Sequence, residues 1–242
     1  MHSLRYNRYG FTLIEMSIVL VIIGLVVGGV LVGRDMIQQA RLQTVVADVN
    51  KYRTAINLFT ERYVFYPGDH PDANAYWPYC LTGGNSCAGN GNGRVMTWGA
   101  EGREASYMWQ HLYLAGLVPN EYQGDRGAPG KISYPELKFK GGYDAYTEET
   151  FQMGYFNIYG LVGNHLRFVT RNAGDYAGPV ISPVDAYSID VKTDDGKADS
   201  GKARARNGDN GAGSAYAGCL TGTSYNLNEK RNLCSVYFFV GQ

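Results

Sequence analysis

A continuous apolar segment near the N-terminus constrains the fold more than any other feature of this chain. It runs from Phe11 to Gly33, a stretch of 23 residues with one ionisable side chain, Glu15. As a helix it would be about 34 Å long, enough to cross a hydrocarbon core of about 30 Å. A carboxylate inside such a segment costs roughly 2.5 to 3.5 kcal/mol on insertion scales. We therefore expect a membrane-spanning helix in which Glu15 has a positively charged partner.

The residues before this segment indicate how it is oriented in a membrane. His2, Arg5 and Arg8 precede Gly10 without any acidic residue. Basic residues flanking a membrane span stay on the cytoplasmic side. The N-terminus is therefore expected to remain in the cytoplasm, and the rest of the chain is expected to lie outside it.

The sequence GFTLIE, from Gly10 to Glu15, resembles the processing site of type IV prepilins and type II secretion pseudopilins. The resemblance implies that a prepilin peptidase in the membrane cuts after Gly10. It implies that the new first residue, Phe11, is N-methylated. It also implies that Glu15 pairs with the amine of Phe11 on a neighbouring subunit, while the helices pack into a filament.

Two other kinds of N-terminal segment fit these residues less well. A secretory signal peptide ends in a small-residue cleavage site, whereas this chain continues from Arg34 in helical register. A plain single-span anchor leaves Gly10 and the costly Glu15 without a role. The prepilin interpretation accounts for both residues.

The chain is expected to have three parts: a leader at residues 1–10, which is removed, a helix at 11–64, and a globular head outside the cytoplasm at 65–242. Residues 11–33 of the helix would form the membrane span and later the filament core. Residues 34–64 contain neither Pro nor Gly and are amphipathic. Their apolar face consists of Leu42, Val45, Val49, Tyr52, Ile56, Phe59 and Tyr63.

Four glycines interrupt the apolar half of the helix at regular spacing. Gly24 and Gly28 form one Gly-xxx-Gly pair, and Gly29 and Gly33 form another. Each interior glycine costs about 1 kcal/mol relative to alanine. This cost favours a role in close helix packing, although membrane helices also tolerate glycine more readily than soluble ones.

All four cysteines, Cys80, Cys87, Cys219 and Cys234, lie in the part of the chain expected outside the cytoplasm, where disulfides persist. Four cysteines allow three pairings. We predict local pairing, Cys80 with Cys87 and Cys219 with Cys234, because both loops are short. No Cys-x-x-Cys motif occurs and the histidines are scattered, so a zinc site is not indicated.

The head is predicted to contain several short elements after a Gly-, Pro- and Asn-rich loop at residues 66–99. They are a helix from Ala105 to Gly116, a β-hairpin between Met153 and Arg171 with its turn at Gly163-Asn164, a helix from Ser182 to Asp190, a polar loop from Lys192 to Ala217, and a strand from Ser235 to Val240. The expected fold class is α+β. The resemblance implies a pilin-like arrangement in which the long N-terminal helix packs on an antiparallel sheet.

One loop has the composition of a metal site. Asp190, Asp194, Asp195 and Asp199 could offer carboxylate oxygens to calcium, and the resemblance to pseudopilins, some of which hold calcium in a loop near the C-terminal end of the head, adds to this. The spacing differs from that of an EF-hand, and runs of Asp and Gly also form solvated turns. Calcium is the only cofactor that the sequence indicates, and none is required.

Other chemistry is not indicated. The chain lacks Gly-x-Ser-x-Gly, His-Glu-x-x-His and Walker motifs, so we expect no enzyme. Lys plus Arg equal Asp plus Glu at 22 each, so the chain has no overall basic field for nucleic acid. Acidic residues interleave the basic residues of the polar loop, which argues against a DNA contact there. Those basic residues are Lys192, Lys197, Lys202, Arg204 and Arg206.

The resemblance implies a structural subunit of a type IV pilus or related filament. Such a subunit polymerises with copies of itself and with minor pilins, and an ATPase and a platform protein assemble it from the inner membrane. Three alternatives stay open: a pseudopilin of a periplasmic type II secretion pseudopilus, a minor pilin with an adhesive or DNA-binding head, and a membrane-anchored enzyme or solute-binding protein with a fortuitous N-terminus.

Overall fold

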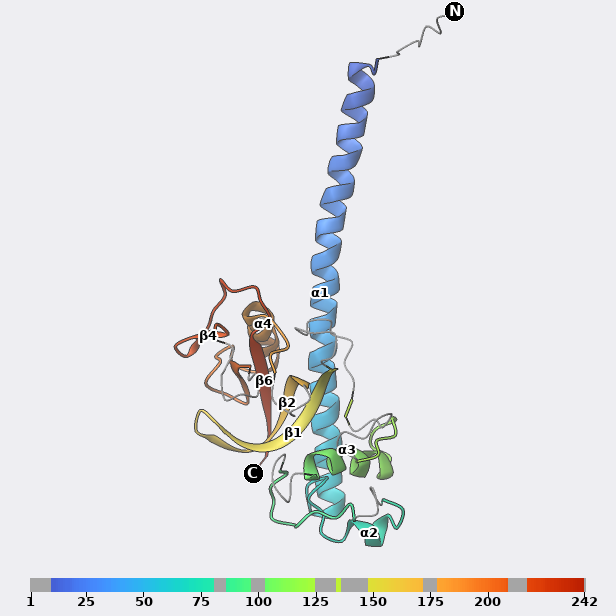
Figure 1. Cartoon of the computed structure of the whole chain (residues 1–242), viewed down its shortest axis with the longest axis vertical. Coiled ribbons are helices and arrows are strands. Elements are labelled where there is room, and N and C mark those ends of the chain that lie inside the picture. Colours follow the sequence, from blue (N-terminus) through green and yellow to red (C-terminus); the bar gives the residue numbers. More distant parts are fainter. Residues whose placement is uncertain are drawn as a thin grey trace, which may run out of the picture. The chain divides into compact units, whose positions relative to one another are not determined.

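A computed structural model describes residues 10–80, 86–96, 103–124, 134–135, 148–171, 178–208 and 217–241 of the chain (Figure 1). The chain divides into two compact units, Met1–Gln43 and Thr44–Gln242. The first unit contains the apolar part of the N-terminal helix. The second contains the remainder of that helix and the whole head.

The N-terminal helix, α1 (Leu13–Tyr63), is continuous over 51 residues. It begins two residues later than expected because Thr12 caps it instead of extending it. It ends before Val64, whose φ of 70° lies in the left-handed region. Pro67 follows shortly and cannot continue a helix. The helix therefore ends one residue before the predicted boundary at residue 64.

The second half of α1 buries the apolar face that the spacing of its residues predicts. Within the head unit, the buried apolar side chains of α1 are Val45, Val49, Tyr52, Ala55, Ile56 and Phe59, and Tyr63 is half-buried. The short helix α3 (Glu104–Leu114) lies against this face. There Trp109 is buried, and its ring meets that of Tyr52 edge-on with centroids 4.7 Å apart.

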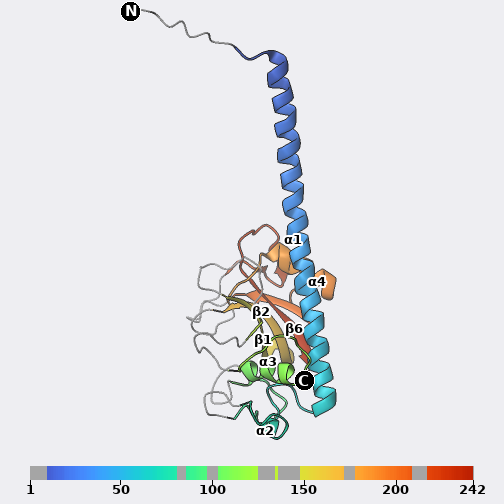
Figure 2. The same cartoon turned by 90° about the vertical axis from the view of Figure 1, so that its right-hand side faces the viewer.

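The main sheet of the head has four antiparallel strands in the order β1-β2-β6-β3. Their bounds are β1 (Glu148–Ile158), β2 (Leu161–Arg171), β3 (Ala203–Asn207) and β6 (Cys234–Gly241). The sheet lies alongside the second half of α1 (Figures 1 and 2), where Arg53 donates hydrogen bonds of 2.7 and 3.2 Å to the carbonyl oxygen of Phe239. This is the α+β, pilin-like architecture that was predicted.

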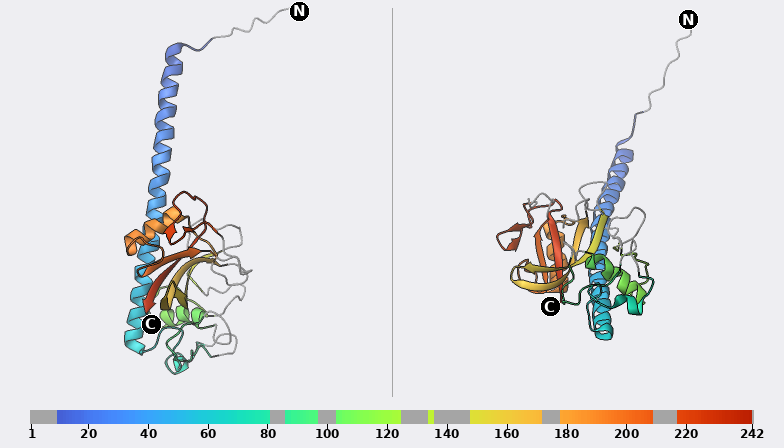
Figure 3. Two further views of the ribbon diagram at one scale, coloured as in Figure 1. Left: turned by 90° about the vertical axis from the view of Figure 1, so that its left-hand side faces the viewer. Right: turned by 60° about the horizontal axis from the view of Figure 1, so that its bottom comes forward.

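Small elements occupy the two ends of the head, and the views in Figure 3 separate them clearly. At one end are α4 (Pro183–Thr193) and a two-stranded sheet of β4 (Leu220–Thr221) and β5 (Ser224–Tyr225). At the other end α2 (Ala73–Tyr76) follows the C-terminal end of α1. The Ser182 hydroxyl accepts a hydrogen bond from the Asp185 amide at 3.2 Å, as expected of an N-cap.

The predicted hairpin is present, but its predicted turn was wrong. Ile158 pairs with Leu161, so the turn consists of Tyr159 and Gly160, with φ of 50° and 83°. Positive φ at both central residues is the type I′ geometry, which matches the twist of the flanking strands. Asn164 instead lies within β2, where its side chain accepts a hydrogen bond from the Val95 amide at 2.9 Å.

The prediction of a polar loop from Lys192 to Ala217 was also wrong in part, because the strand β3 lies within this segment. Ala203 and Ala205 are buried while Arg206 is exposed. Alanine gives little β propensity, and the arginines gave the segment the composition of a loop. The strand conformation of β3 therefore depends on its pairing with β6.

A buried carboxylate holds the loop after α1. Asp69 accepts hydrogen bonds from the amides of Gly91 at 2.9 Å, Asn92 at 3.3 Å and Gly93 at 2.7 Å. Burial raises the pKa of Asp69, and these backbone donors oppose that rise. These hydrogen bonds hold residues 91–93 of the loop close to the end of α1.

Both disulfides form the predicted local pairs. The Cα atoms of Cys80 and Cys87 are 5.6 Å apart, and those of Cys219 and Cys234 are 5.0 Å apart. Cys234 is the first residue of β6, so the second disulfide joins this strand to the segment that precedes β4.

Candidate functional site

A reciprocal set of hydrogen bonds closes the N-terminus of α1. The amide and hydroxyl of Thr12 each donate to Oε2 of Glu15 at 2.8 Å. The Glu15 amide in turn lies 3.3 Å from the Thr12 hydroxyl oxygen, which accepts its hydrogen bond. This is a capping box, in which N-cap and N3 residues satisfy each other's backbone groups. Among the described residues, Oε1 of Glu15 accepts no hydrogen bond.

The apolar part of α1 is exposed along its length. The helix is long and apolar enough to cross a membrane, and the most apolar window of 18 residues has no share buried in the protein. Exposed apolar side chains occur on all its faces, including Leu20, Ile23 and Val26. A helix that is apolar all round requires lipid or other helices around it.

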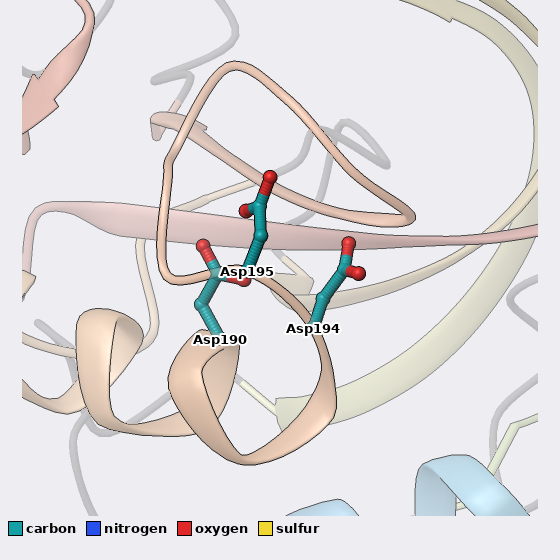
Figure 4. A group of neighbouring side chains, drawn as sticks. All are labelled: Asp190, Asp194 and Asp195. Carbon is teal, nitrogen blue, oxygen red and sulfur yellow. The ribbon is translucent and has the colours of Figure 1, made fainter.

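A second cluster of polar residues lies at the end of α4, where three of the four predicted aspartates come together (Figure 4). One carboxylate oxygen each from Asp190, Asp194 and Asp195 lies within 4.8 Å of the others. Asp190 is buried, and the other two are exposed. Asp199 is not part of this group.

The loop that follows α4 supplies hydrogen bonds to each carboxylate. Asp190 accepts from the Tyr225 hydroxyl at 2.7 Å and from the Gly196 amide at 3.3 Å. Asp194 accepts from the backbone amides of Lys202 and Ala203.

Asp195 accepts from the Lys197 amide at 2.9 Å and from the Ser200 hydroxyl at 2.6 Å. The aspartates therefore organise the loop as well as offering oxygens to a cation. Gly201, with a φ of 67°, allows the chain to pass close to the Asp194 carboxylate, which a Cβ atom would obstruct.

The buried member of the cluster titrates abnormally. Burial raises the pKa of Asp190 to about 6, although the hydrogen bonds from Tyr225 and Gly196 oppose the rise. The negative charges of Asp195 and Asp194 raise it further. Ionising all three carboxylates is therefore unfavourable unless a cation compensates them.

Comparison with known proteins identifies only the N-terminus. Residues 5–31 match the family model described as the prokaryotic N-terminal methylation motif. The N-terminus is of the prepilin and pseudopilin type. The rest of the chain lies outside this match, and no curated protein and no solved structure matches the chain.

In the prepilin-type N-terminus, Thr12 is the residue that the sequence prediction missed. The pattern Thr12-Leu13-Ile14-Glu15 fits the Ser/Thr-x-x-Glu signature of a capping box and was visible in the sequence. The membrane cost of Glu15 indicated a partner on a neighbouring subunit and gave no sign of this local one. The carboxylate therefore has a partner within its own subunit before any neighbour is present.

Among the residues that the structure describes, nothing packs against the four glycines of the prepilin-type helix. A Cβ atom added at Gly24, Gly28, Gly29 or Gly33 would meet nothing within 4 Å. Their proposed role in packing against neighbouring helices stays a prediction.

The basic residues of the polar loop include one with a structural role. The guanidinium group of Arg204 donates to the carbonyl oxygens of Gly201 at 3.0 Å, Ile158 at 2.6 Å and Tyr159 at 2.9 Å. These bonds tie the β1–β2 turn to the aspartate-rich loop. A group used in this way is poorly placed to bind phosphate.

The raised pKa of Asp190 predicts a pH-dependent stability of the head. Its unfolded-state pKa is about 3.9, so ionisation between about pH 4 and pH 6 destabilises the folded state. The free energy of unfolding should fall as pH rises through this window, relative to that of Asp190→Asn, by about 3 kcal/mol in all. Thermal unfolding of both full-length proteins with chelator at pH 4 and pH 7 tests this. If the unmodified chain and Asp190→Asn differed in free energy of unfolding by the same amount at pH 4 and at pH 7, the prediction would be contradicted.

Proposed function

We propose that this chain is a structural subunit of a type IV pilus or pilus-like filament. The observation that carries the proposal is the methylation motif at residues 5–31, followed without a break by an exposed apolar helix. The α+β head adds support, because it matches the architecture of pilins. A role as structural protein accounts for these features without catalysis.

The proposed pathway begins in the inner membrane. Arg5 and Arg8 keep the leader in the cytoplasm, and the head folds outside it, where Cys219 and Cys234 can oxidise. A prepilin peptidase then removes residues 1–10. An assembly ATPase and a platform protein move the subunit into the filament, where α1 exchanges lipid for the helices of identical subunits and related minor pilins.

Processing provides the direct test. The mature protein from membranes or filaments should begin at Phe11, with a methyl group on its amine, as measured by intact-protein and peptide mass spectrometry. Gly10→Val should leave the full-length chain uncut, because the cut follows this glycine in the proposed site. A mature N-terminus at Met1 or near Gly33 would rule out this processing.

A separate experiment tests whether the filament forms on the cell surface or in the periplasm. Cell-surface filaments collected by shearing should contain this chain as their main protein if it forms a pilus. A chain that polymerises only in the periplasm would support the second candidate, a type II secretion pseudopilin. The observation that favours this candidate is the carboxylate cluster of Asp190, Asp194 and Asp195, because some pseudopilins hold calcium in a loop near the C-terminal end of the head.

We propose calcium as the cation for this cluster. Calcium binds six to eight oxygen ligands and tolerates irregular geometry. A loop that contains several carboxylates can provide such ligands. Within the described chain, Oδ1 of Asp194 accepts no hydrogen bond and can serve as a ligand. Burial is the main cause of the raised pKa of Asp190, and a bound cation would also offset the smaller contribution from the negative charges of Asp195 and Asp194.

Calcium should raise the melting temperature of the head relative to a chelator. A ligand at 100 times its dissociation constant adds about 2.7 kcal/mol to the free energy of unfolding. Asp194→Ala should abolish the calcium-dependent difference. Asp199→Ala, which changes an aspartate outside the cluster, should preserve it. Identical melting curves with calcium and with chelator would leave the aspartates with their loop-forming role alone.

A further inference from the structure

The loop after α1 contains two consecutive Asn-Gly pairs, Asn90-Gly91 and Asn92-Gly93. In such a pair the backbone nitrogen of the glycine can attack Cγ of the asparagine side chain, because glycine has no Cβ atom to hinder the approach. The attacking nitrogen loses its proton and bonds to Cγ, while the side-chain nitrogen takes up a proton and leaves as ammonia. Water then opens the succinimide ring to aspartate or isoaspartate. Both pairs are therefore candidate sites of spontaneous deamidation.

The conformation of the loop requires both residues of each pair. Gly91 and Gly93 have φ of 72° and 80°, in the left-handed region that glycine adopts without strain. The Asn90 carboxamide accepts a hydrogen bond from the Asn92 amide at 3.0 Å, and the Asn92 carboxamide accepts one from the Arg94 amide at 2.8 Å. Asparagine favours such turns with the residue two positions on. The fold thus retains a reactive sequence and directs each carboxamide toward the chain that follows it.

One buried carboxylate holds both attacking nitrogens. The Gly91 amide donates to Oδ1 of Asp69 at 2.9 Å, and the Gly93 amide donates to Oδ2 at 2.7 Å. Asp69 is fully buried, and hydrogen bonds to a charged acceptor are stronger than those between neutral groups. A carboxylate is too weak a base to take an amide proton for itself. The contact therefore restrains each nitrogen and does not activate it.

The peptide of Gly93 is also fixed through its carbonyl group. Nδ2 of Asn164 donates to the Gly93 carbonyl oxygen at 2.8 Å, while Oδ1 of Asn164 accepts from the Val95 amide at 2.9 Å. Asn164 is fully buried within β2. Release of the Gly93 nitrogen therefore requires an opening that also frees this part of the loop from the sheet.

Deamidation at these positions would disrupt the loop. Besides Asp69, a second buried acid binds it: Glu104 accepts from the amides of Asn90 at 3.3 Å and Met96 at 2.9 Å. A new carboxylate at position 90 or 92 would lie close to these two acids, and like charges repel strongly away from water. Isoaspartate would also add a methylene group to the backbone and displace the amides that Asp69 binds.

We propose that Asp69 protects Asn90 and Asn92 from deamidation by holding the backbone nitrogens of Gly91 and Gly93. Deamidation then proceeds only from a locally open form of the loop in which these hydrogen bonds are broken. When opening and closing are fast, its rate is that of the free sequence multiplied by the fraction of molecules in the open form. This role of Asp69 does not depend on the proposed filament function.

The unmodified chain provides the first test. The full-length protein in detergent is incubated at neutral pH, and peptide mass spectrometry with fragmentation measures conversion at Asn90 and Asn92. Both should convert at least about tenfold more slowly than in a synthetic peptide of residues 88–96, since one hydrogen bond to a charged group corresponds to roughly ten- to a hundredfold. Hydrogen exchange of the Gly91 and Gly93 amides should be slowed by a similar factor, because exchange and deamidation need the same opening.

Asp69→Asn tests the residue itself. Asparagine keeps the size of the side chain but cannot accept from both glycine amides, because an NH2 donor replaces one of the two oxygens. Conversion at positions 90 and 92 should rise by roughly ten- to a hundredfold. Glu104→Gln is the matched control and should change it far less, since the amides that Glu104 binds, those of Asn90 and Met96, are not attacking nitrogens.

A third pair, Asn207-Gly208, is an internal control in every molecule. The Gly208 amide donates to the carbonyl oxygen of Leu233 at 2.9 Å, and Oδ1 of Asn207 accepts from the Cys219 amide at 2.9 Å. This pair is held without Asp69, so its conversion should be unchanged in Asp69→Asn and would rise only if the whole head unfolded.

Three results would overturn the proposal. The first is conversion of Asn90 and Asn92 in the unmodified chain at the rate of the free peptide. The second is slow conversion while the amides of Gly91 and Gly93 exchange freely, because the protection would then have another cause. The third is an Asp69→Asn variant that accelerates conversion at positions 90, 92 and 207 equally, or at none of them.

Discussion

Glu15→Val is expected to abolish filaments while the head still folds and the chain still inserts. Before assembly, Glu15 lies five residues after Gly10 and can reach the cytoplasmic interface of the membrane. In a filament core its proposed partner is the amine of Phe11 on an adjacent subunit. Breaking a buried ion pair costs about 3 to 5 kcal/mol, and every 1.4 kcal/mol is about tenfold in affinity. Filament yield should therefore fall by about a hundredfold or more.

The capping box makes a sharper set of variants available. Glu15→Gln keeps a capping side chain at N3 but removes the charge, since Gln serves in a capping box as Glu does. Thr12→Val keeps the charge but removes the cap. If Glu15 acts through pairing, Glu15→Gln should lose filaments and Thr12→Val should retain most of them.

The readouts are the yield of sheared filaments, the level of the chain in membranes, and cleavage after Gly10. Normal filaments from Glu15→Gln would show that capping of α1 is the main role of the carboxylate. Failure of Glu15→Val to insert at all would also contradict the pairing role and favour a plain anchor.

Removal of the Cys219–Cys234 disulfide is expected to have the second largest effect. Replacing both cysteines by serine should lower the free energy of unfolding of the head by roughly 2 to 5 kcal/mol. This corresponds to a fall in melting temperature of roughly 5 to 20 °C for a domain of this size. Both cysteines are fully buried, so the serines would also bury two hydroxyl groups at the start of β6.

The other disulfide is the matched control. Its sequence separation is 7 residues instead of 15, so loop entropy alone predicts a loss about 0.7 kcal/mol smaller. The double replacement of Cys80 and Cys87 should therefore be milder. Thermal unfolding of the two variants gives the comparison, and the amount of subunit in membranes gives its consequence in cells. Equal melting temperatures for the Cys219/Cys234 variant and the unmodified chain would refute the prediction.

The elements that could be predicted from the sequence are those with strong local signals. The end of α1 follows from Pro67, and its buried face follows from the spacing of Val45, Val49 and Tyr52. The beginning of α4 follows from Ser182 and Pro183. Each signal acts within one or two turns of chain.

The elements that could not be predicted depend on distant partners. Strand β3 has alanines and arginines in alternation, and it becomes a strand only beside β6. The turn at Tyr159-Gly160 was missed because Gly163-Asn164 has the stronger turn composition, whereas the pairing of β1 with β2 decides the register.

The aspartate cluster was predicted in part for a geometric reason. Asp190 and Asp194 are four residues apart at the end of a helix, so their side chains lie one turn apart on the same face, and Asp195 follows directly. Asp199 lies beyond Gly196, where the loop changes direction. Composition alone gave no reason to exclude it.

The position of β6 has a consequence for when the head can fold. This strand ends at Gly241, yet it pairs with both β2 and β3. Neither of those strands can complete its pairing until β6, which follows both of them in the sequence, has been synthesised. Until then β2 exposes an unpaired edge. A chain cut before Cys234 would therefore lose the centre of the sheet at once, although β1, β2 and β3 would all be present.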